Sequence, residues 1–71
     1  MINTKKLYER MKELGVRQSD IAELLQVARP TVSQKLRNVR PMYLDEAWKI
    51  AKKLEIAEDL FCVYFFAENV A

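Results

Sequence analysis

Apolar residues recur at helical spacing in short blocks along this chain, and few residues between the blocks can form other structure. Leu7, Met11 and Leu14 stand at positions i, i+4 and i+7, and Gly15, the only glycine of the chain, follows at once. A glycine just after such a block is typical of a helix C-terminus, where the backbone turns left-handed. The spacing therefore predicts a first helix over residues 4–14.

The next two blocks are shorter and lie close together. Val32, Leu36 and Val39 repeat the i, i+4, i+7 spacing. Pro30 fits only the first turn of that block, where its missing N–H would be unpaired anyway, and Pro41 ends the block. We expect helices over residues 18–25 and 29–38, with Val27 in the turn between them.

Two more apolar stripes follow in the second half of the chain. They consist of Leu44, Ala47, Trp48, Ala51 and Leu54, and then of Leu60, Phe61, Tyr64 and Phe65. We expect helices over residues 43–54 and 57–66. A chain of 71 residues has room for one core. The sequence thus predicts a single domain over residues 1–71 with an all-α fold, a compact bundle of about five short helices.

Charge is unevenly distributed, although the net charge is only +2. Residues 1–40 contain nine Lys and Arg against four acids, whereas residues 41–71 contain three against six. No acid occurs from Gln26 to Arg40. A basic half of this kind suits a polyanionic partner, and the same charges would also serve simply to solvate helix faces.

Residue types that carry catalysis are scarce. The chain has no histidine and a lone Cys62, which excludes a zinc site and a Ser-His or Cys-His nucleophile. A single glycine excludes a glycine-rich phosphate loop. We therefore expect no enzyme activity, cofactor, metal or small-molecule ligand. The unpaired cysteine, the lack of a signal peptide and a longest apolar run of only eight residues, 60–67, predict a cytoplasmic protein outside the membrane.

The stretch from Gln18 to Leu36 resembles the helix-turn-helix of phage Cro and repressor N-terminal domains, the xenobiotic-response-element-like family. The matching residues are Gln18, Ile21, Ala22, Leu25, Val27, Thr31, Val32, Ser33, Lys35 and Leu36. The likeness extends over about residues 4–67, and the ending Tyr64 to Ala67 is similar to small regulators of phages and integrated elements in Gram-positive bacteria. The resemblance implies a lambda-repressor-like DNA-binding domain with its motif at about 18–38.

The resemblance also implies roles for individual residues. Base contacts would come from the first two turns of the third helix, at Arg29, Thr31, Ser33 and Gln34; phosphate contacts would come from Gln18, Lys35, Arg37 and Arg40. Gln34 can pair with adenine and Arg29 with guanine. Two alternatives stay open: Thr31 as a local capping group and Gln18 as a solvated first-turn residue.

Three positions depart from the family pattern. Arg17 and Ala28 stand where a capping Ser, Thr or Asn is usual, and we expect Asp20 to satisfy the first of these helix ends. Pro30 replaces a polar side chain that often contacts bases, and it cannot donate a hydrogen bond. The aromatic rings of the fourth helix, at Tyr43 and Trp48, are expected in the core rather than as stacking platforms.

The resulting hypothesis is a sequence-specific transcription regulator that binds a palindromic double-stranded DNA operator as a homodimer. Val63, Phe66 and Val70 are the candidates for the dimer surface. An alternative is a protein-interaction module of the same fold, similar to an antirepressor, which acts on another regulator. A third is the DNA-binding head of a longer repressor, against which the absence of a linker-like tail argues.

Overall fold

A computed structural model describes residues 1–66 of the chain and confirms the all-α prediction. No strand occurs over these residues. The elements are the α-helices α1 (Thr4–Leu14), α2 (Gln18–Leu25), α3 (Arg29–Leu36), α4 (Leu44–Lys53) and α5 (Phe61–Tyr64), with one turn of 3₁₀ helix, η1 (Glu58–Leu60). The first two helices begin and end where their sequence pattern predicted.

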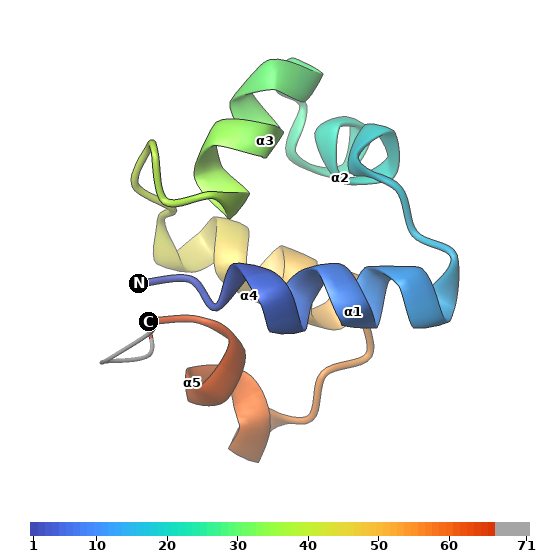
Figure 1. The fold of residues 1–71 in the computed structure, drawn as a ribbon, viewed down its shortest axis with the longest axis vertical. Coiled ribbons are helices and arrows are strands. Elements are labelled where there is room, and N and C mark those ends of the chain that lie inside the picture. The colour runs from blue at the N-terminus through green and yellow to red at the C-terminus, as the bar shows by residue number, and fades with distance from the viewer. Residues whose placement is uncertain (67–71) are drawn as a thin grey trace.

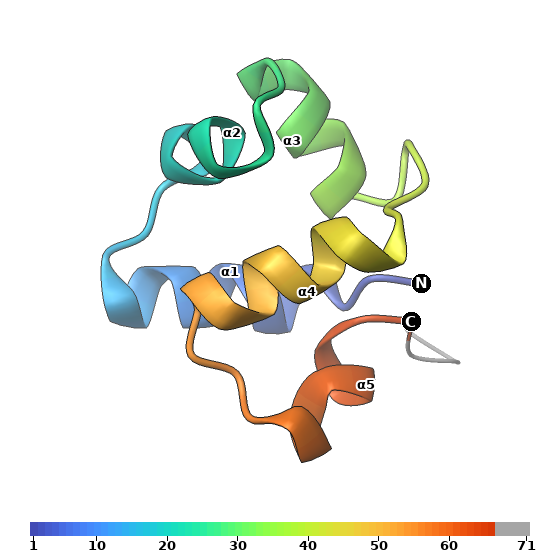
Figure 2. The ribbon, with the colours of Figure 1, turned by 180° about the vertical axis from the view of Figure 1, so that it is seen from behind.

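The helices are arranged in three tiers along the longest axis of the molecule. The α2–α3 pair lies at one end, α1 and α4 cross the middle, and α5 lies at the opposite end (Figures 1 and 2). The N-terminal segment returns to α5, because the Asn3 amide donates a hydrogen bond to the Tyr64 carbonyl over 2.9 Å. This arrangement leaves the outer side of α3 uncovered by any other described helix.

The core lies between the tiers and takes residues from every α-helix. Its fully buried large side chains are Leu7, Ile21, Val32, Leu36, Ile50, Leu54 and Phe65. Phe61 joins the core to the surface, since its ring stacks on Trp48 at 4.0 Å and on Phe65 at 5.0 Å between centroids. Trp48 is 39% exposed and Tyr43 is 63% exposed. The expectation that both rings lie in the core is therefore wrong for Tyr43 and only half met for Trp48.

The unpaired backbone groups at several helix ends are bonded by residues that the sequence pattern partly predicted. Gly15 adopts the left-handed conformation at φ 68° and closes α1. The Asp20 carboxylate accepts a hydrogen bond from the Arg17 amide over 2.8 Å, which confirms the expected substitute cap of α2. At the C-terminus of α4, the Arg10 guanidinium donates to the Leu54 carbonyl over 2.9 Å, so a cation complements this helix end.

Helix α4 is one residue shorter than predicted at each end, and α3 and α5 end two residues early for identifiable reasons. Helix α3 ends at Leu36 rather than at residue 38, because Asn38 turns left-handed at φ 63°. Val39 consequently leaves the apolar stripe assigned to it and is 63% exposed. The single helix expected over 57–66 is a 3₁₀ turn followed by α5, since Phe65 is extended and Phe66 has φ 57°.

No helix within residues 1–66 has the length and apolar character needed to cross a bilayer.

Candidate nucleic-acid interface

The turn between α2 and α3 is tight although it contains no glycine. Gln26 ends α2 in the left-handed conformation at φ 57°, and its backbone N–H donates to the carbonyls of Ala22 and Glu23. The Val27 amide donates to the Ala22 carbonyl over 3.0 Å, and the Val27 side chain packs against the core. These contacts fix the direction in which the chain enters α3.

Helix α3 buries one side and presents the other. Val32 and Leu36 are buried and hold the helix on the core. Arg29, the first residue of the helix, is exposed, and Thr31 and Gln34 are partly exposed. The side chains of these three residues have no hydrogen-bond partner among the described residues, so their donors and acceptors are available to a ligand.

The start of α2 lies beside the start of α3. A shallow hollow on this surface is lined by Gln18, Arg29, Pro30 and Ser33. Gln18 is held loosely, by a 3.4 Å hydrogen bond from its amide nitrogen to the Tyr8 hydroxyl. The structure thus brings one residue predicted to contact phosphate next to two predicted to contact bases.

The two arginines that follow α3 are both exposed. The Arg37 Nε donates to the Ser33 hydroxyl over 3.2 Å and to the Ser33 carbonyl over 3.3 Å. Arg37 therefore orients a predicted base-contacting residue in addition to presenting its own charge. The Arg40 side chain makes no hydrogen bond to a described residue, so its guanidinium is exposed and available to a ligand.

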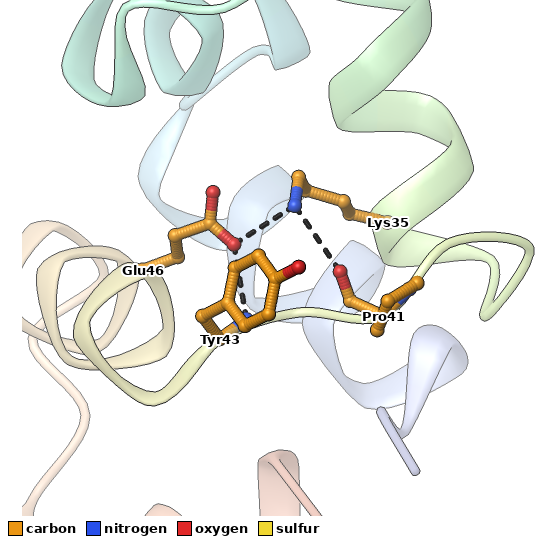
Figure 3. Close-up of polar contacts among 4 residues, drawn as sticks. All are labelled: Lys35, Pro41, Tyr43 and Glu46. Carbon is orange, nitrogen blue, oxygen red and sulfur yellow. Dashed lines mark hydrogen bonds and ion pairs between the residues drawn. The ribbon is translucent and has the colours of Figure 1, made fainter.

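Lys35, predicted to contact phosphate, is not exposed as that role would require, because the fold buries its side chain. Its side chain is only 8% exposed, and its ammonium lies 2.9 Å from Glu46 Oε1 and 3.1 Å from the Pro41 carbonyl oxygen. The Tyr43 ring lies over the same ammonium, 5.0 Å from its centroid (Figure 3). Lys35 stands on the core side of α3 with Val32 and Leu36, so the absence of acids in α3 did not imply that each of its cations was free.

Further contacts that the sequence pattern does not indicate hold the C-terminal end of α3. The Asn38 side chain accepts from the Ile2 amide over 2.8 Å and donates to the Ile2 carbonyl over 2.9 Å. The Thr4 hydroxyl donates to the Leu36 carbonyl. These partners are more than thirty residues apart in the chain, so no local pattern indicates them.

An exposed helix with polar and basic side chains, joined by a tight turn to a second helix of equal length, defines a helix-turn-helix unit of the type that enters the DNA major groove. A family model described as helix-turn-helix (HTH_3, the Cro/C1 type) matches residues 7–61. The chain therefore belongs to this helix-turn-helix family, whose domains are DNA-binding regulators of transcription. Neither a curated protein nor a solved structure matches the chain with significance.

Proposed function

We propose that the protein is a sequence-specific transcription regulator that binds a two-fold symmetric operator, in the manner of a phage Cro protein or a short repressor. The observation that carries the proposal is that the α3 residues Arg29, Thr31 and Gln34 are accessible and that their side chains have no hydrogen-bond partner among the described residues. Groups of this kind pair with base edges in the major groove. No acid from Gln26 to Arg40 opposes the approach of a phosphate backbone.

The contacts divide into two groups. Arg29, Thr31, Ser33 and Gln34 contact bases; Gln18, Arg37 and Arg40 contact phosphates. Gln18 lies in the first turn of α2, and the backbone N–H groups at the start of a helix can bind an anion such as a phosphate. Phosphate contacts fix the register of the protein on the duplex, and base contacts supply the sequence preference.

We further propose that the protein acts as a homodimer. Val63 and Phe66 are 40% and 41% exposed, while Val70 lies outside the described residues. Phe66 also lines a hollow with Met1 and Val39, which are likewise exposed. Covering these residues with a second copy would remove apolar surface from water. Two-fold symmetric operators of this kind have half-sites about 34–36 Å apart, one turn of DNA.

The test of operator binding is a selection of bound sequences from a random duplex library, followed by affinity measurements at several salt concentrations. We expect an enriched palindrome and a steep fall of affinity with salt, because several phosphate contacts release counterions. Equal binding to all sequences, with no enriched motif, would contradict the proposal. Failure to bind any duplex, together with capture of another regulator, would favour the antirepressor-like alternative.

The test of the dimer is sedimentation equilibrium of the wild type and of two variants. Phe66→Ser should weaken self-association strongly. Leu14→Ser is the matched control, because Leu14 is 36% exposed at the end of α1, away from the hollow that Phe66 lines. Equal self-association of both variants and the wild type would place the dimer surface elsewhere.

A further inference from the structure

The junction between α3 and α4 contains a buried charge with several partners. Lys35 is the buried charged residue of the described part of the chain, at 7% exposure. Its ammonium is bound by the Glu46 carboxylate at 2.9 Å and by the Pro41 carbonyl at 3.1 Å. The same Glu46 Oε1 atom accepts the Tyr43 amide over 3.0 Å (Figure 3). One carboxylate oxygen therefore joins the last turn of α3 to the first turn of α4.

This network ties together three consecutive parts of the chain. Lys35 belongs to α3, Pro41 to the connection, and Glu46 to α4. A buried ammonium is stable only when it is paired and hydrogen-bonded, so the side chain is confined to one position. Lys35 follows Gln34 directly and lies one turn beyond Thr31, so fixing Lys35 restricts the rotation of α3 about its own axis.

We infer that Lys35 and Glu46 are positioning residues for DNA recognition: their ion pair sets the angle at which the exposed side of α3 meets the major groove. The inference rests on the proposed function. A helix rises about 1.5 Å per residue, so Arg29 lies about 9 Å along α3 from Lys35. A tilt of about 10° at Lys35 would move Arg29 by about 1.5 Å, whereas a recognition site tolerates about 0.5 Å.

A phosphate contact and a positioning residue have opposite signatures. If the Lys35 ammonium left Glu46 to bind a phosphate, Lys35→Met would weaken every duplex alike and lower the salt slope by about one. Removing Glu46 would then release the ammonium and strengthen binding. If the pair positions α3, removing either partner has the same result: the preference for the selected sequence falls, while binding to unrelated sequence and its salt dependence persist.

The experiment measures the affinity of the full chain by fluorescence anisotropy. The probes are the duplex recovered by selection and a duplex of equal length with scrambled sequence, each at several potassium chloride concentrations. The variants are Lys35→Met and Glu46→Ala. Lys49→Met and Asp45→Ala remove the same charges from exposed positions of α4 and serve as matched controls. Arg40→Ala provides the signature of a phosphate contact.

We expect Lys35→Met and Glu46→Ala each to lower the ratio of affinities for the two duplexes about tenfold relative to their controls, with an unchanged salt slope. The double variant should lose no more than either single one, because the two residues act as a unit. Circular dichroism at the assay temperature establishes that each protein is folded. Should Lys35→Met unfold, Glu46→Gln takes its place, since it keeps the acceptor and removes the charge; its ratio should fall in the same direction.

Three outcomes would overturn the inference. One is a uniform loss with a lower salt slope for Lys35→Met, as for Arg40→Ala. The second is tighter binding by Glu46→Ala beyond that of Asp45→Ala. The third is an unchanged affinity ratio in folded variants, which would make the pair merely structural. Failure of the wild type itself to distinguish the two duplexes would instead contradict the proposed function.

Discussion

The two ends of α3 differ in almost every physical respect. At its N-terminus Ala28 provides no capping group, and Arg29 and Pro30 are exposed. At its C-terminus Lys35 and Leu36 are buried, and each is bound by residues from another part of the chain. The difference shows how a helix of eight residues can be both rigid and accessible: it is anchored at one end and presented at the other.

The two ends also depend on interactions of different range. The anchored end is held by Thr4 and Ile2 from the N-terminal segment and by Glu46 from α4. The presented end relies on local means, chiefly the fixed φ of Pro30 in the first turn. We therefore expect the largest losses of folding stability from substitutions at the anchored end, and smaller changes of stability from substitutions at the presented end.

The largest effect is expected at Leu36, the fully buried side chain of the anchored end. Leu36→Ala should lower the free energy of unfolding by about 2–5 kcal/mol, because it removes apolar burial and leaves a cavity. Urea unfolding followed by circular dichroism measures the loss. Leu44→Ala is the control, since Leu44 is 56% exposed, and it should change stability by less than about 0.5 kcal/mol. Equal losses in both variants would mean that α3 is not anchored through its core face.

The next effect is expected at exposed residues in and beyond α3, in DNA binding rather than in stability. Gln34→Ala should cost about 1–3 kcal/mol of discrimination at a single base position. Arg40→Ala should weaken binding to all sequences alike and lower the salt slope by about one. Repeating the duplex selection with each variant measures both. Arg40 is a cleaner comparison than Arg37, because Arg37 also holds the Ser33 side chain. Identical profiles for the two variants would contradict the division into base and phosphate contacts.

The same contrast explains how much the sequence could predict. Helices α1 and α2 begin and end as expected, because Gly15 and Asp20 are local signals for a helix end and a helix start. The end of α3 depends instead on Asn38 meeting Ile2, which is 36 residues away. Helical periodicity describes one segment at a time, so it cannot show a contact of that range.

The site was predicted to a similar extent and for the same reason. Gln34 lies on the side of α3 away from Val32 and Leu36, as helical periodicity requires, whereas Arg29 is exposed because it begins the helix. Lys35 was misplaced because its partner Glu46 lies in the next helix. Charge counts along the sequence reveal a basic segment but do not reveal which cation a fold will pair.

A smaller effect is expected at Asn38, just beyond the anchored end. Asn38→Ala removes both hydrogen bonds to Ile2 and places a Cβ-bearing residue without a local bond at φ 63°. We expect a loss of about 1–2 kcal/mol in unfolding free energy. Asn38→Gly separates the two causes, since glycine accepts the left-handed conformation and also loses the bonds. A glycine variant as stable as the wild type would mean that the Ile2 contact contributes nothing.

The smallest effect is expected at the presented end, where Ala28 leaves the first N–H groups of α3 without a side-chain acceptor. Ala28 has the extended backbone of an N-cap, with φ −70° and ψ 150°, so Ala28→Ser requires no change of conformation. A serine hydroxyl there should raise the unfolding free energy by about 0.5–1 kcal/mol. Ala28→Val is the control, because valine supplies bulk but no acceptor. If serine tightened the binding of the selected duplex by more than this gain in stability explains, the uncapped end would be mobile before it meets DNA. If serine left stability unchanged, water would already satisfy the unpaired N–H groups. The contrast between the two ends of α3 would then rest on burial alone.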